Sequence, residues 1–155
     1  MKKLYISPSK ENLVTLEISN LLKEYLKRDD IDVYIADEDL TNRSYEAEEL
    51  MSDIYLCIRV FENKNSNNIP IIICKNIDES RLLSNLIFDQ IKLIYNKNIQ
   101  FEDVLESKKI LSKDKILIPF CFIGFDCDEK QSEWLNLNKE KIAKAIAVGI
   151  KEYFR

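Results

Sequence analysis

The pattern of apolar and polar positions alternates between two periods along the chain. Short and nearly continuous apolar runs favour buried strands, and they stand at 2–6, 31–36, 53–60, 69–75 and 115–125. Between them, apolar residues recur at helical spacing, which predicts helices over about 10–27, 44–51, 78–95 and 138–154. Strands that alternate with helices predict an α/β domain with a mostly parallel, twisted sheet of about five to six strands flanked by helices.

Local signals refine these elements. The hydroxyl of Ser9 can accept a hydrogen bond from a first-turn amide, so we expect Ser9 to N-cap the first helix. The apolar stripe of that helix is expected to contain Leu13, Leu16, Leu21, Leu22 and Tyr25. Residues 96–114 are expected to combine loop and a short helix, and Trp134 is expected to pack in the core. Because no linker or repeat divides the chain, residues 1–155 are expected to form a single domain.

Composition limits the class of protein. Hydrophobic residues make up 46% and charged residues 32% of the chain, which is typical of a folded globule. The net charge is -4 and the basic residues are interspersed with acidic ones, so no nucleic-acid partner is expected. No apolar run is long enough to cross a membrane, and the first ten residues do not form a signal peptide. We therefore expect a cytoplasmic location, with export or association with a spore or phage as alternatives.

Two absences exclude most common catalytic chemistry. The chain has no histidine, which excludes Ser-His-Asp and Cys-His catalysis and HExxH metal sites. It has only two glycines, Gly124 and Gly149, which excludes Walker and GxGxxG phosphate loops. The four cysteines form no CxxC pair and are expected to be reduced, most of them buried. A cation, Arg59, stands in the otherwise apolar run 53–60 and requires an explanation.

Three stretches of the chain resemble, in order, the zinc-dependent N-acetylmuramoyl-L-alanine amidases of the Amidase_3 type, and most of all their clostridial branch. The tail "FIGFDCDEKQSEWLNLNKEKIAKAIAVGIKEYF" is similar to the family's Gly-Phe turn and final helix. The stretch "RSYEAEELMSDIYLCIR" is similar to its Arg-x-x-x-Ala entry into a central strand, with Arg43, Ala47 and Asp53 in register. The start, "LYISPSKENLVTLEISNLLKEYL", resembles its first strand and helix. The resemblance implies the amidase scaffold, a phosphorylase/hydrolase-like fold.

In that family two histidines and a glutamate hold a catalytic zinc ion, and a second glutamate is the general base. The resemblance places Lys10 and Arg59 at the two histidine positions. Phe61 stands at an asparagine position and Phe122 at the general base, while Glu11 matches the surviving glutamate ligand. Two cations repel Zn²⁺, and one carboxylate cannot hold it. The expected cofactor is therefore none, with the zinc site of the family lost.

Several roles for these residues stay open. Arg59 can form a bidentate ion pair with Glu11, or it can simply extend into solvent. Glu11 can also serve only to favour the start of the first helix. A substitute metal site from Glu11, Cys57 and Cys121 is a further alternative, as is a cysteine nucleophile activated by a nearby cation.

The resulting prediction leans away from an enzyme. We expect a catalytically inactive amidase-like protein that binds a peptidoglycan fragment or an amidase partner protein, with Lys10 and Arg59 suited to a carboxylate. One alternative is a divergent cell-wall amidase with a non-standard metal site. Another is a structural or assembly subunit. The sequence predicts no oligomeric state.

Overall fold

The computed structural model describes residues 1–155 except 10–11, 37–42, 63–70, 75–77, 96–99 and 104–117. Its elements in chain order are β1 (Lys2–Ser7), α1 (Leu13–Lys27), β2 (Ile31–Ile35), α2 (Arg43–Glu49), β3 (Ile54–Glu62), β4 (Ile71–Cys74), α3 (Asp78–Lys92), β5 (Gln100–Asp103), β6 (Phe120–Cys127), α5 (Glu129–Leu137) and α6 (Lys139–Phe154).

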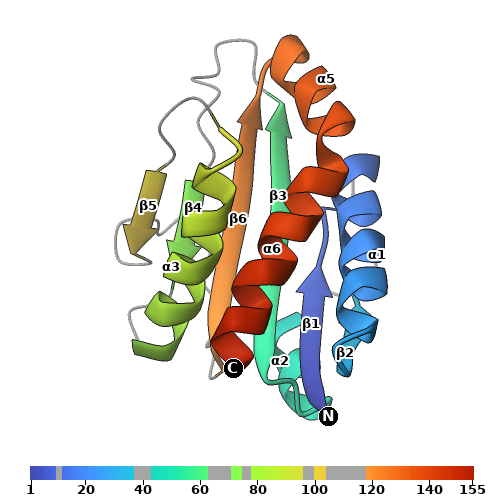
Figure 1. The fold of residues 1–155 in the computed structure, drawn as a ribbon, viewed down its shortest axis with the longest axis vertical. Coiled ribbons are helices and arrows are strands. Elements are labelled where there is room, and N and C mark those ends of the chain that lie inside the picture. Colours follow the sequence, from blue (N-terminus) through green and yellow to red (C-terminus); the bar gives the residue numbers. More distant parts are fainter. Residues whose placement is uncertain (10–11, 37–42, 63–70, 75–77, 96–99, 104–117) are drawn as a thin grey trace.

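The strands form one six-stranded sheet in the order β2-β1-β3-β6-β4-β5. The four strands β2, β1, β3 and β6 are parallel, whereas β4 runs antiparallel to β6 and pairs in parallel with β5. Figure 1 shows the arrows of β1, β3 and β6 pointing to the same end of the molecule. The predicted α/β class with a mostly parallel sheet is therefore confirmed.

Helices α1, α3 and α6 cover one face of the sheet (Figure 1). Alternate residues of each strand point towards these helices and are apolar. The helices pack against them with apolar residues at helical spacing. The strand residues of this core include Leu4, Ile6, Leu56, Ile58, Ile123 and Phe125. Helix α6 contributes Ile142, Ile146 and Ile150, all fully buried.

On the opposite face, four aromatic rings form a row across the four parallel strands. Tyr5 stacks on Tyr34, with ring centroids 5.5 Å apart, and meets Tyr55 edge-on at 5.3 Å. Tyr55 in turn meets Phe120 edge-on at 5.2 Å. Helix α2 closes on this row, because its Glu46 accepts a hydrogen bond of 2.9 Å from the Tyr5 hydroxyl. Edge-to-face and stacked ring pairs each add stability beyond the area they bury.

The first helix begins later than the sequence predicted. Asn12, not Ser9, caps α1, since its Oδ1 accepts from the amide of Val14 at 2.9 Å. The expected stripe is also wrong in part, because Leu13 is 69% exposed. The buried residues of α1 are Thr15, Ile18, Ser19, Leu22 and Leu26.

The region 96–114 contains a strand, β5, that the sequence pattern did not predict. The rest of the expected loop and short helix lies largely outside the described residues. Trp134 packs against the core as predicted, with its ring 4.7 Å from that of Tyr95.

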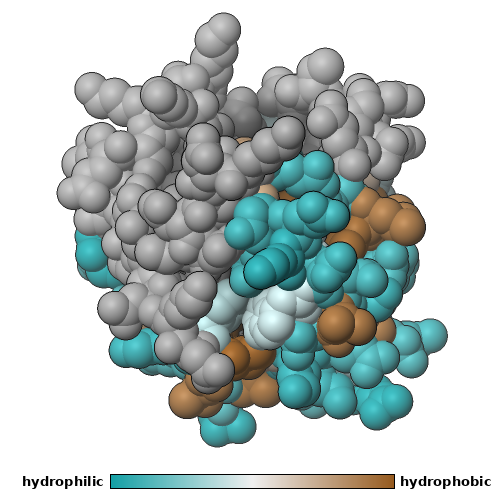
Figure 2. Space-filling model, turned by 90° about the horizontal axis from the view of Figure 1, so that it is seen from above, coloured by the Kyte–Doolittle hydropathy of each residue, from teal (hydrophilic) through white to brown (hydrophobic). Residues whose placement is uncertain are grey.

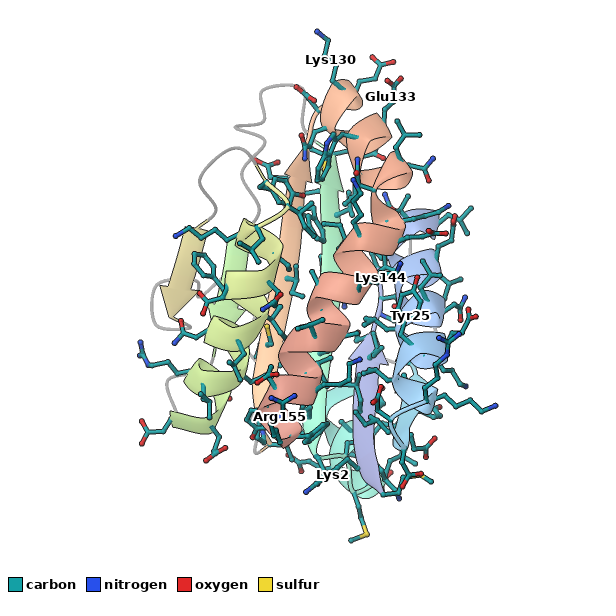
Figure 3. All side chains as sticks on the ribbon, viewed as in Figure 1. Lys2, Tyr25, Lys130, Glu133, Lys144 and Arg155 are labelled. Atoms are coloured by element: carbon teal, nitrogen blue, oxygen red, sulfur yellow. The ribbon has the colours of Figure 1, made fainter. Side chains whose placement is uncertain are left out.

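Polar contacts hold the last helix against its neighbours. The Lys144 ammonium lies 5.8 Å from the ring of Tyr25 on α1 (Figure 3). Lys139 forms an ion pair with Glu17 of α1, and the Tyr153 hydroxyl donates to Glu79 of α3 at 2.8 Å. Among the described helices, none has the length and apolar character needed to cross a bilayer.

Helices α3 and α6 touch backbone to backbone at Gly149. A Cβ atom built there would lie 2.8 Å from the Cα of Ile87 and 2.9 Å from its backbone nitrogen. Gly149→Ala should therefore force the two helices apart, and we expect it to lower the free energy of unfolding by about 1–3 kcal/mol, despite the better helix propensity of alanine. Urea unfolding of the two proteins measures this difference.

Val148→Ala is the matched control, because Val148 is the preceding residue of α6 and is 38% exposed. It should change the unfolding free energy by less than about 0.5 kcal/mol. Equal stabilities of Gly149→Ala and the wild type would contradict the close helix packing.

Candidate functional site at the carboxyl end of the parallel strands

The parallel strands β1, β3 and β6 end at one edge of the sheet, and α1 begins at the same edge. In open α/β sheets this edge is where ligands bind, because loops there leave crevices above the strand ends. Figure 2 views the molecule from this end, where the described surface is mostly hydrophilic with small hydrophobic patches. The residues that the sequence singled out in β3 and β6 lie towards this edge, on the sheet face opposite α1, α3 and α6.

Arg59 reaches from β3 across to the last residue of β1. Its Nη1 donates to the carbonyl oxygen of Ser7 at 2.6 Å and to that of Ile58 at 2.9 Å, and its Nη2 donates to the Ser7 hydroxyl at 3.1 Å. Ser7 is fully buried, whereas Arg59 is partly exposed. The alternative in which Arg59 simply extends into solvent is therefore wrong: its guanidinium is fixed between two strand ends.

Two phenylalanines and a glycine lie beside Arg59. Gly124 is the register partner of Arg59 on β6, and Phe122 lies two residues before Gly124 on the same face. The ring of Phe61 stacks on that of Phe122, with centroids 6.4 Å apart. A Cβ at Gly124 would lie 2.9 Å from the Phe122 ring and 3.2 Å from the Phe61 ring, so the glycine makes room for the stack. Phe122 is 1% exposed and Phe61 is 44% exposed.

The turn before α1 forms the other wall. The Thr15 hydroxyl accepts from the amide of Ser9 at 2.9 Å and lies 2.9 Å from the carbonyl oxygen of Asn12, to which it donates. Together with the Asn12 cap, these bonds fix the start of the helix over the strand ends. A pocket of about 370 Å³ lies between this turn and the end of β3, lined by Ser9, Asn12, Val60, Phe61 and Glu62.

The described cysteines near this edge do not assemble a metal-binding group. Cys57 belongs to the cluster that contains Phe122, whereas Cys121 and Cys127 belong to the core on the other face. Because Cys57 and Cys121 lie on opposite faces of the sheet, the substitute metal site that would use both is wrong. Within the described ranges, no three Cys, Asp or Glu side chains are placed to share a metal ion.

Burial makes Cys127 a poor nucleophile. Its burial in the core raises the pKa of its thiol to about 12. A hydrogen bond from Ser132 lowers the pKa, but burial has the larger effect. The charges of Asp126, Asp128 and Glu62 raise the pKa further. A thiol with a raised pKa carries little thiolate at neutral pH, so Cys127 is a poor nucleophile there.

The structure thus brings together three of the five residues that the sequence predicted for the site: Arg59, Phe61 and Phe122. Lys10 and Glu11 lie outside the described residues, so the alternative in which Glu11 pairs with Arg59 is untested. Sequence reasoning missed Ser7, which holds the guanidinium. The available signal was its place directly after the strand predicted at 2–6, which was expected to run parallel to the one with Arg59.

Comparison with solved structures identifies the fold. No protein-family model and no curated protein matches the sequence. The structure is nevertheless similar to the catalytic domain of CwlV, an N-acetylmuramoyl-L-alanine amidase from Bacillus (Paenibacillus) polymyxa var. colistinus, with a TM-score of 0.81 and 16% identity. The match covers 99% of this chain and 98% of that one. The chain has the fold of the N-acetylmuramoyl-L-alanine amidases.

Two further amidase structures support this assignment. The CwlD amidase of Clostridioides difficile, solved in complex with the GerS lipoprotein, gives a TM-score of 0.73 at 19% identity, covering 99% of this chain and 98% of that one. An amidase from Clostridium difficile 630 gives 0.75 at 18% identity, covering 99% and 96%. The amidase fold is therefore present over essentially the whole length of each chain. At these identities the likeness establishes the fold alone.

Removing the guanidinium of Arg59 should weaken the contact between the ends of β1 and β3. Arg59→Met keeps a long side chain but leaves the Ser7 carbonyl and hydroxyl without the Arg59 donors. Because hydrogen bonds from charged groups contribute more than neutral ones, we expect a loss of about 1–3 kcal/mol in urea unfolding. Glu62→Ala, three residues further along β3 and exposed, should change stability by less than about 0.5 kcal/mol. Equal stability of Arg59→Met and the wild type would show that the Ser7 contacts contribute nothing.

The raised pKa of Cys127 predicts a loss of stability at alkaline pH. The unfolded thiol ionises near its ordinary pKa of 9.0, whereas the folded thiol stays neutral until about pH 12. The stabilisation from the neutral thiol is thus complete below about pH 9 and is lost as the pH rises towards 12, by up to about 1.4 kcal/mol per pH unit. Urea unfolding at a series of pH values should show a shallower decline for Cys127→Ala than for the wild type. Identical slopes would mean that the folded thiol ionises normally.

Proposed function

We propose that this chain is a catalytically inactive relative of the zinc amidases that binds a peptidoglycan fragment at the carboxyl end of its strands. The observation that carries the proposal is the fixed guanidinium of Arg59. By the resemblance to the clostridial branch of the family, Arg59 stands where that family has a histidine ligand of zinc. Residues 1–155 act in this proposal as one amidase-like unit.

The residues present do not fit a zinc ion. The chain has no histidine, and the guanidinium of Arg59 repels a divalent cation at short range. The resemblance places Phe122 at the position of the family's general base, and this apolar, almost fully buried side chain cannot accept a proton. The zinc-bound water of such a hydrolase would therefore lack both histidine ligands of its metal and its general base in this chain. We accordingly propose that the chain needs no cofactor.

Loss of chemistry leaves a positive group and a pocket in place. Arg59 attracts carboxylates, which cell-wall stem peptides carry. The neighbouring pocket offers the polar side chains of Ser9, Asn12 and Glu62 together with the exposed ring of Phe61. Convergent polar groups beside an apolar surface are typical of a ligand site. The fold shared with peptidoglycan amidases supports a cell-wall fragment as the ligand.

A protein partner is the second candidate. One of the similar structures, the CwlD amidase, was solved in complex with the GerS lipoprotein, so the amidase fold can present a surface to another protein. In that case the chain would regulate an active amidase by pairing with it.

Activity, metal content and binding test the proposal together. We expect the purified protein to retain no stoichiometric zinc after equilibration with zinc and dialysis, and to release no stem peptide from purified sacculi. We expect disaccharide-containing muropeptides to raise its melting temperature, because a ligand that binds only the folded state stabilises it.

An active zinc amidase assayed on the same sacculi is the control for substrate quality. Release of stem peptide that a chelator abolishes would overturn the inactivity. An unchanged melting temperature with muropeptides would contradict the cell-wall ligand. The protein partner would then be the remaining candidate, and co-purification with an amidase would test it.

A further inference from the structure

The hydrogen bonds of Arg59 occupy one side of its guanidinium. An arginine has five N–H donors arranged in a planar fork. Nη1 uses its two hydrogens on the carbonyl oxygens of Ser7 and Ile58, and Nη2 uses one on the Ser7 hydroxyl. Since Nη1 and Nη2 both face Ser7, the unused donors are the Nε–H and the second N–H of Nη2. These two point in parallel from the remaining edge of the plane.

No residue that the structure describes accepts a hydrogen bond from that remaining edge. Among the described residues, the buried side-chain nitrogen and oxygen atoms that lack a partner are Ser84 Oγ and Tyr95 OH. The Nε of Arg59 has no hydrogen bond to any residue that the structure describes, and it is not one of these buried atoms. The contacts with Ser7 hold the guanidinium plane in place, which means that little rotamer freedom is left to lose when a ligand binds.

Two parallel N–H donors match the two oxygens of one carboxylate. A bidentate arginine–carboxylate pair is stronger and more directional than a contact through a point charge. Phe61 lies two residues further along the same strand face, at a spacing of about 7 Å, and its ring is 44% exposed. A carboxylate bound to Arg59 would therefore have an apolar surface within the length of one residue.

We propose that the Nε–Nη2 edge of Arg59 binds the free C-terminal carboxylate of a short peptide, with Phe61 contacting the side chain of the residue before it. This inference rests on the proposed function and makes it specific: the recognised part of the cell-wall fragment is the end of its peptide, not its sugar. The peptide backbone then runs towards the pocket, where Ser9, Asn12 and Glu62 provide hydrogen-bonding groups.

The experiment compares two ligands that differ only at the terminus. The probes are N-acetyl-Lys-D-Ala-D-Ala with a free carboxylate and the same tripeptide as a C-terminal amide. NMR titration of the full chain should show that the acid binds at least about tenfold more tightly than the amide, the size expected when a charge-assisted pair is lost. Equal affinities, or no binding of the acid, would overturn the inference.

Two variants separate the roles of Arg59 and Phe61. Arg59→Lys keeps the charge but has no planar fork, and it should reduce the acid-to-amide ratio towards one without changing the affinity for the amide. The melting temperature of Arg59→Lys shows whether this variant folds. If it does not fold, the acid and amide affinities of Phe61→Ala still test the assignment. Phe61→Ala should weaken the acid and the amide equally and leave their ratio unchanged. A ratio that is unchanged in folded Arg59→Lys, or lost in Phe61→Ala, would contradict the assignment.

Glu11→Gln tests the competing internal pair. If Glu11 occupied the open edge of Arg59, its removal would raise the affinity for the acid tenfold or more, and the inference would fall. We expect no change. Muropeptide binding serves as a separate readout: if muropeptides bind while acid and amide are equivalent, the proposed function stands and this inference fails. If the acid binds and muropeptides do not, the carboxylate site stands and the cell-wall ligand fails.

Discussion

The guanidinium of Arg59, held by the carbonyl and hydroxyl of Ser7, joins the ends of β1 and β3 where the sheet opens towards solvent. In the amidase fold this edge of the parallel strands is where a ligand would be expected. Once a permanent cation is fixed there, the local charge favours anions and opposes metal ions. The same contacts satisfy part of the hydrogen-bonding capacity of a fully buried serine, so Arg59 contributes to both stability and charge at this edge.

Around this contact the fold supplies rigidity from both faces of the sheet. Three helices pack on one face, and α3 and α6 come so close at Gly149 that no side chain fits between them. On the other face, the row of rings from Tyr34 to Phe120 crosses all four parallel strands. The end of β3, which carries Arg59 and Phe61, is thus the continuation of a strand that is buried on both faces. A site on rigid elements holds its donors in position before a ligand arrives, which lowers the entropic cost of binding.

Particular residues show how far the sequence could predict the site. The apolar runs located β1, β2, β3 and β6, because a strand buried on both faces has a simple pattern. The resemblance placed Arg59, Phe61 and Phe122 in one site, and the structure shows them on one face of β3 and β6. The strand β5 was not predicted, because a four-residue segment has too few positions to show the alternation of apolar and polar residues that is typical of a strand. The cap of α1 was assigned to Ser9 because serine and asparagine are equally good caps, and only the path of the turn selects Asn12.

The sequence by itself determined the chemistry that is absent and the class of fold. A chain without histidine and with two glycines cannot build histidine-ligated metal sites or Walker and GxGxxG phosphate loops, whatever its fold. Its alternation of apolar runs and helical stripes determined an α/β sheet. Only the tertiary structure decided that Arg59 bonds to Ser7 instead of extending into water, and that Cys57 and Cys121 lie on opposite faces. The physical reason is that these outcomes depend on pairing between segments about 50 or more residues apart, and strand order and register are properties of the assembled sheet.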